Sequence, residues 1–164
     1  MTETTQITTA TVLRPDELLA HWQGHRALTR RVIEAFPEEA FFTHRIGGMR
    51  PFSEMCQELL QIAHAGIQEI ATGKQATYGN GIDHGNRKAA FLARWDETTD
   101  LINTLWPDIQ PEQFQAPFKA FGQWEGTVIS TLLYYIDNEI HHRGQGYVYL
   151  RDLGITPPPF WERA

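Results

Sequence analysis

Apolar residues recur at helical spacing in four long segments of this 164-residue chain, and this pattern constrains the fold more than any other feature. Pro15 suits the first turn of a helix, Pro37 stops that helix, and Gly73 ends the next one. The pattern predicts helices over about 15–35, 52–72, 87–105 and 125–153. No stretch of useful length alternates as a strand would. The sequence therefore predicts an all-α four-helix bundle.

The segments between these helices predict the domain organisation. Residues 1–13 are Thr-rich and are predicted to form a flexible N-terminal tail, and 14–164 a single domain. Residues 38–49 are expected to be a connection that packs Phe41 and Phe42 against the bundle. Residues 74–86, rich in Gly, Asn and Asp, are predicted to form a long loop, and a short turn or helix is expected within 110–116.

Charge and composition exclude several classes of protein. The net charge of −6 argues against nucleic-acid binding, because phosphate contacts need clustered Lys and Arg. No segment approaches the roughly 18 apolar residues that span a bilayer. Cys56 is the single cysteine, so an internal disulfide is impossible, which fits a reducing, cytoplasmic setting. We expect a cytoplasmic protein that contacts neither nucleic acid nor membrane.

The most distinctive motif is the run from Asn138 to Gln145, which places two adjacent histidines in the last helix. Residues four apart share a helix face, so His142 lies beside Asn138, and His141 beside Asp137. Zinc and nickel accept imidazole and carboxylate ligands, which makes Asp137 with His141 the better pair by chemistry alone. From spacing alone, a surface position or a polar network is the more frequent outcome for both histidines.

Other candidate residues have a simpler structural interpretation. His21 and His25 are also four apart but lie on an apolar face, where histidines are more often hydrogen-bonded core residues than ligands. Glu58 lies at the edge of an apolar stripe and can point into a site or toward water. His64 stands alone, and Cys56 is expected to be a small buried apolar residue.

Two segments of the sequence are characteristic when taken together. They are Met49–Met55 and the C-terminal motif, namely His141-His142-Arg143-Gly144-Gln145, Tyr149-Leu150-Arg151, Gly154 and Pro157-Pro158. With the helix spacing over about residues 14–160, they resemble the DinB-like (DinB/YfiT-type) family of four-helix-bundle proteins, which includes thiol transferases that use bacillithiol or mycothiol.

The resemblance implies a divalent metal, zinc or nickel, held by three histidines. One family ligand matches His142, whereas the other two positions carry Asn138 and Glu58. A Glu/Asn/His set is more oxygen-rich than three imidazoles, so it is an atypical metal site. His64 lies six residues beyond Glu58 on a different helix face, which argues against both serving one metal.

Two main functions are open. The first is a metal-dependent transferase or hydrolase with Glu58, Asn138 and His142 as ligands; the metal would lower the pKa of a bound thiol or water, and Arg143 would orient an anionic group. The alternative is a non-catalytic protein that has lost the metal and binds a small molecule or a partner, with the three residues in a hydrogen-bond network. A nucleic-acid function, suggested by the family name alone, conflicts with the charge.

The family is often dimeric, and Tyr134 and Tyr135 are expected on an exposed helix face. We therefore expect a homodimer, with a small molecule or thiol as the substrate.

Overall fold

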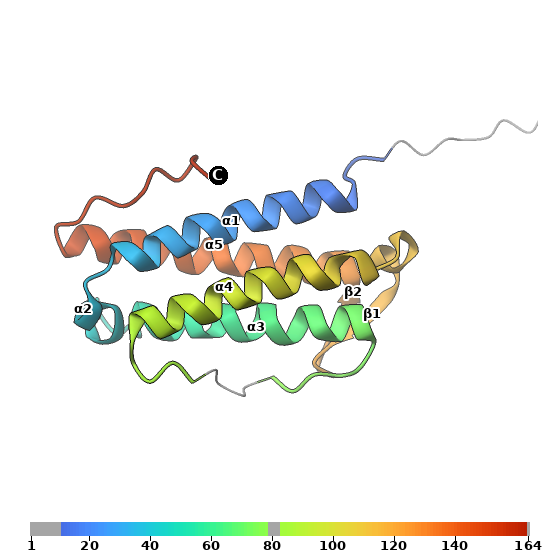
Figure 1. Ribbon diagram of the computed structural model, residues 1–164, viewed down its shortest axis with the longest axis horizontal. Helices are drawn as coiled ribbons and strands as arrows, with labels where there is room; N and C mark the ends of the chain where they lie inside the picture. Colours follow the sequence, from blue (N-terminus) through green and yellow to red (C-terminus); the bar gives the residue numbers. More distant parts are fainter. Residues whose placement is uncertain (1–10, 79–82, 164) are drawn as a thin grey trace, which may run out of the picture.

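The structure, a computed structural model, describes residues 11–78 and 83–163. Most of the predicted tail, residues 1–10, and part of the predicted loop, residues 79–82, lie outside these ranges. Four long helices run side by side and confirm the predicted four-helix bundle (Figure 1). They are α1 (Pro15–Ala35), α3 (Phe52–Thr72), α4 (Lys88–Leu105) and α5 (Val128–Asp152).

Local signals in the sequence account for the helix ends. Pro15 begins α1, where its missing N–H is harmless, and Gly73 ends α3 with a φ of 67°. Thr127 and Ser130 cap α5 reciprocally: Ser130 N donates to Thr127 Oγ1 at 3.2 Å, and Thr127 N donates to Ser130 Oγ at 2.8 Å. This cap fixes the start of α5 at Val128, three residues later than predicted.

A β-hairpin precedes α5, so the expectation of helix from residue 125 was wrong. Strand β1 (Pro117–Ala120) pairs antiparallel with β2 (Trp124–Thr127). The turn between them contains Phe121 and Gly122, both with positive φ (52° and 68°). Each strand has four residues, too few for an alternating pattern to be recognised. The hairpin lies against one end of the bundle (Figure 1).

Short helices occupy the remaining connections. Helix α2 (Glu38–Thr43) forms within the segment predicted to be a plain connection, and it buries Phe41 completely. Two 3-10 helices follow α4, η1 (Trp106–Asp108) and η2 (Pro111–Gln115), and η2 confirms the turn or helix expected within 110–116.

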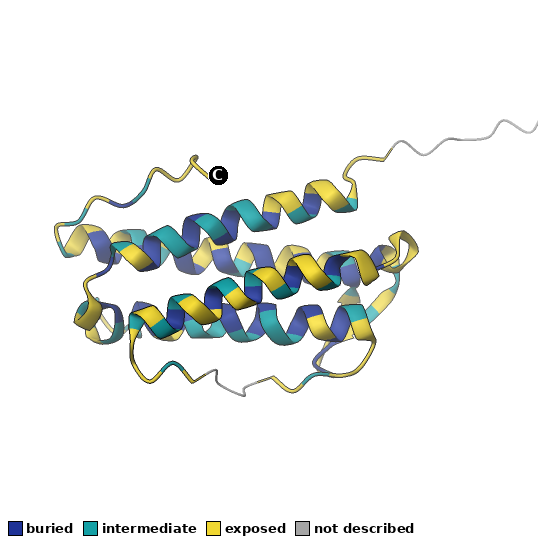
Figure 2. Cartoon of the chain, in the orientation of Figure 1, coloured by how far each residue is buried: buried dark blue, intermediate teal, exposed yellow. Residues whose placement is uncertain are grey.

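The buried residues of the helices, dark blue in Figure 2, include two apolar clusters. One lies toward the hairpin and includes Trp22, Ile67 and Tyr135. The other lies toward α2 and includes Phe36, Phe52 and Trp95. None of the helices within the described ranges is both long and apolar enough to cross a membrane.

Glycines allow α3 and α5 to approach closely at both ends of their contact. A Cβ at Gly66 would lie 2.5 Å from the Tyr135 hydroxyl, and a Cβ at Gly146 would lie 2.5 Å from the Phe52 ring. Larger residues at either position would force the helices apart. This close packing brings the half-buried faces of α3 and α5 together between the two glycines.

A layer of buried polar side chains separates the two apolar clusters. It is formed by His25, Arg26 and Thr29 of α1 with Glu139 and Arg143 of α5. Thr29 donates a 2.6 Å hydrogen bond to Glu139, and Arg143 donates to the His25 Nδ1 at 2.9 Å. The His25 ring thus lies between Arg143 and Arg163, whose Nη1 is 3.1 Å from His25 Nε2.

Acidification is expected to destabilise the protein through His25. Burial, followed by the nearby charges of Arg143, His21 and Arg163, lowers the pKa of His25 to about 3. The folded state resists protonation of His25, whereas the unfolded state does not. The contribution of neutral His25 to the free energy of unfolding is therefore complete above the ordinary pKa of about 6.5 and is lost as the pH falls from there through about 3. From pH 6.5 to 5, the free energy of unfolding should fall by about 2 kcal/mol.

Urea denaturation at the two pH values measures this loss. His25→Gln keeps an acceptor for Arg143 but does not titrate, so its unfolding free energy should depend less on pH. An equal pH dependence in the variant and the wild type would show that His25 does not cause the loss.

Candidate functional site

Helices α3 and α5 bring together the three residues predicted as ligands. Glu58 Oε1 lies 3.2 Å from His142 Nε2 and accepts a 3.1 Å hydrogen bond from Asn138 Nδ2. Arg50, just before α3, donates to Glu58 Oε2 from Nη2, and the same nitrogen is 3.5 Å from His142 Nε2. We call these four residues the Glu58 cluster.

The Glu58 cluster holds its carboxyl group in the charged form. Burial disfavours the charge, but hydrogen bonds from the other three members and the positive charge of Arg50 outweigh burial and hold the pKa of Glu58 below its ordinary value. The Glu58 and Arg50 side chains are 21% and 39% exposed, so water reaches both partners of the ion pair. The cluster is therefore a carboxylate–guanidinium pair at the surface of the bundle.

The His142 ring is fixed from its other side by Gln145. His142 Nδ1 lies 2.8 Å from Gln145 Oε1, so the amide oxygen can accept the Nδ1 proton. Across the ring, Nε2 faces both Arg50 and Glu58 Oε1. Gln145, three residues along α5, thus positions the imidazole as an outer partner positions a metal-binding histidine.

The distance between the donor atoms of the cluster suits a metal ion, but the charges of its side chains do not. A separation of 3.2 Å between Glu58 Oε1 and His142 Nε2 is close to that of two ligands around one tetrahedral zinc ion, each about 2 Å from the metal. Arg50, however, already neutralises the only carboxylate in the cluster. The third donor is a neutral amide whose NH₂ group faces Glu58. The residues as arranged do not fit a resident dication.

The other candidate ligands do not converge on this site. Asp137 and His141 are exposed on α5. His64 Nδ1 lies 3.3 Å from Thr98 Oγ1 of α4. Cys56 is fully buried, and burial raises the pKa of its thiol, as expected for a structural cysteine. Within residues 11–78 and 83–163, no group of three or more His, Cys, Asp and Glu side chains could hold a metal ion.

Arg143 was predicted to orient an anionic substrate, but the structure contradicts this role. Its guanidinium group is buried against α1, where Nη1 donates to Thr29 Oγ1 at 3.0 Å and lies 3.9 Å from Glu139. Adjacent residues on a helix point about 100° apart. His142 therefore faces α3 whereas Arg143 faces α1. The same contacts make His25 a hydrogen-bonded core histidine.

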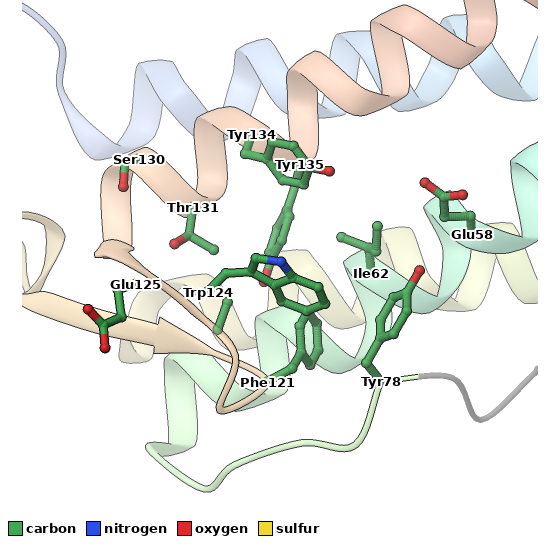
Figure 3. Close-up of a pocket in the computed structure, with 11 residues that line it drawn as sticks. Glu58, Ile62, Tyr78, Phe121, Trp124, Glu125, Ser130, Thr131, Tyr134 and Tyr135 are labelled. Carbon is green, nitrogen blue, oxygen red and sulfur yellow. The ribbon is translucent and has the colours of Figure 1, made fainter.

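A pocket of about 330 Å³ begins at Glu58 and extends toward the hairpin. Five of its lining residues are aromatic, and we call it the aromatic pocket: Tyr78, Phe121, Trp124, Tyr134 and Tyr135. Figure 3 shows Glu58 at the opposite end of the pocket from Ser130 and Glu125. The polar groups of the Glu58 cluster therefore adjoin one end of a mostly apolar cavity.

The two tyrosines predicted to be exposed, Tyr134 and Tyr135, have different surroundings. Tyr134 is 58% exposed, but Tyr135 is only 4% exposed and packs between α5 and α3, so the prediction was wrong for Tyr135. Burial, with a smaller contribution from the charge of Glu69, raises the pKa of Tyr135. The homodimer stays a prediction, which light scattering would test; a monomer at every concentration would contradict it.

Sequence reasoning missed Arg50 as a member of the site, together with the pocket residues Tyr78, Phe121 and Trp124. Arg50 precedes its helix and has no periodic signal. Tyr78 and Trp124 come from segments separated by more than forty residues in the sequence. The aromatic composition of residues 117–124, interrupted by Gly122, was the one available hint of the hairpin.

Comparisons with known proteins agree with this architecture. The model of the DinB family matches residues 1–164. A Bacillus subtilis (strain 168) protein named uncharacterized protein YjoA is 23% identical over 149 residues, which cover 90% of this chain and 96% of YjoA.

Two crystal structures of DinB-like proteins share the fold. That of YjoA from Bacillus subtilis has a TM-score of 0.70 at 18% identity and covers 90% of this chain and 99% of its own. That of a protein from Bacillus cereus ATCC 10987 has a TM-score of 0.67 at 14% identity and covers 89% and 97%.

Proposed function

The chain belongs to the DinB family, and we propose that it binds a small organic molecule in the aromatic pocket. The observation that carries this proposal is a cavity of about 330 Å³ with mainly apolar walls and a polar cluster at one end. Small-molecule sites have this combination, because apolar walls supply binding energy and a few polar groups orient the ligand.

The Glu58 cluster would orient the polar end of the ligand. Its carboxylate is fixed by hydrogen bonds to α5 and to Arg50, so it does not have to be ordered when the ligand binds. Such preorganisation reduces the entropic cost of binding. In this proposal the atypical residues Glu58 and Asn138 serve recognition.

Three compounds with one phenylbutyl body test this proposal: 4-phenylbutylamine, 4-phenylbutanol and 4-phenylbutyrate. Saturation-transfer NMR should detect binding of at least one of them. Trp124→Ala removes part of the pocket wall and should weaken that binding about fivefold to tenfold. Trp161→Ala is the matched control, because Trp161 is also exposed, at 67%, but does not line the pocket. If none of the three compounds binds, the proposal is wrong.

A second candidate function is a metal-dependent transferase or hydrolase with Glu58, Asn138 and His142 as ligands of zinc or nickel. It is favoured by the 3.2 Å separation of Glu58 Oε1 and His142 Nε2, and by Gln145 at the opposite ring nitrogen. It requires Arg50 to leave the carboxylate. Elemental analysis after incubation with Zn²⁺ or Ni²⁺ tests it, since a metal-free protein would exclude it.

A further inference from the structure

Three of the aromatic rings that line the pocket pack against one another. The centroids of Tyr78 and Phe121 are 5.5 Å apart, those of Tyr78 and Trp124 are 5.7 Å apart, and those of Phe121 and Trp124 are 6.1 Å apart. The rings meet at tilted or edge-on angles and support one another. The face of an aromatic ring carries negative electrostatic potential and attracts an ammonium group within about 6 Å of the ring centroid, so aromatic walls favour a cationic ligand.

The charged residues along the pocket also favour a positively charged ligand. Among the described residues that line it, the charged ones are Glu58 and Glu125, and both are acidic. Glu58 Oε1 faces two members of its cluster, whereas Oε2 faces Arg50 alone. A carboxylate oxygen offers about two acceptor positions, so Oε2 keeps one for a ligand. Although Arg50 offsets the charge of Glu58, this end of the pocket can therefore accept a hydrogen bond from an ammonium group.

The nearby basic groups lie outside the pocket wall. Arg50 bonds to Glu58 from beyond the lining residues, and Lys119 pairs with the exposed Glu125 at 3.4 Å. The net charge of −6 adds a weak long-range attraction for cations. The side chains that would contact a ligand are therefore aromatic, apolar, hydroxyl-bearing or acidic.

From these observations we infer that the aromatic pocket selects an organic amine in its ammonium form over neutral and anionic molecules of the same shape. This inference rests on the proposed function, because it names the chemical class of the ligand for the same pocket. The ammonium group would lie at the Glu58 end of the pocket, beside Tyr78, with the apolar body of the amine toward Phe121 and Trp124 of the hairpin.

Isothermal titration calorimetry at pH 7.5 with the same three phenylbutyl compounds tests the inference. 4-Phenylbutylamine should bind about tenfold or more tightly than 4-phenylbutanol, which has nearly the same shape without the charge. 4-Phenylbutyrate should bind most weakly. Glu58→Gln keeps the shape of residue 58 but removes its charge, so it should reduce the preference for the amine. Glu54→Gln is the matched control, because Glu54 is an exposed residue of α3 outside the pocket.

The outcomes separate the inference from the proposed function. If the alcohol or the carboxylate binds as tightly as the amine in the wild type, the pocket binds small molecules but the inference about charge is wrong. If none of the three compounds binds, both fail. If the amine is preferred, and Glu58→Gln reduces that preference while Glu54→Gln does not, the inference holds.

Discussion

Replacing Arg50 with methionine is expected to raise the affinity of the Glu58 cluster for Zn²⁺ about 10- to 100-fold. In the wild type, the guanidinium group engages both Glu58 and His142, the two strongest donors of the cluster. Methionine has a similar length but no charge, so it frees both donors and removes the repulsion of a dication. The expected gain in zinc affinity is smaller than Coulomb's law gives for two buried charges, because Arg50 is 39% exposed and water screens its charge.

Competition with a chromophoric zinc chelator measures this change. Arg45→Met is the matched control, because Arg45 lies in the same segment but pairs with Glu54 at the surface, at 3.3 Å. Adding His142→Ala to Arg50→Met should abolish the gain. If wild-type protein already binds one zinc ion tightly and Arg50→Met adds nothing, Arg50 does not compete with the metal, and the metal-dependent function becomes the better proposal.

The fold could be predicted from the sequence wherever local signals coincide with periodicity. Helices α1 and α3 end where predicted, because Pro37 cannot continue a helix and Gly73 readily takes the left-handed conformation that ends one. The hairpin could not be predicted, because its four-residue strands depend on each other and on the end of the bundle. The reciprocal cap of Thr127 and Ser130 then sets the start of α5.

The candidate site was predictable only in part, for reasons that lie in helix geometry. The family resemblance pointed to Glu58, Asn138 and His142, and the structure brings these three side chains together. Arg50 reaches them from an extended segment for which helical periodicity carries no information. The role predicted for Arg143 was wrong because its side chain points about 100° away from that of His142, its neighbour on the helix.

Removing the Glu139 side chain is expected to produce the largest loss of stability, with Glu139→Ala costing about 3–5 kcal/mol of unfolding free energy. Glu139 is 2% exposed and is the carboxylate of the buried polar layer. Burial lowers the pKa of Arg26 to about 10, while the charges of Glu139 and Asp96 oppose this shift. Without Glu139, Arg26 and Arg143 would be two buried cations with no carboxylate in the layer.

Urea denaturation measures the free energy of unfolding of Glu139→Ala and Glu125→Ala, and the difference between the two variants isolates the effect of burial. Glu125 also pairs with a basic residue, Lys119, but its side chain is 81% exposed, so its loss should cost no more than about 1 kcal/mol. Glu139→Gln keeps an acceptor for Thr29 and should be intermediate, because it removes the charge but not the hydrogen bond. If Glu139→Ala is no worse than Glu125→Ala, Arg26 and Arg143 reach water without it, and the polar layer does not depend on a buried carboxylate.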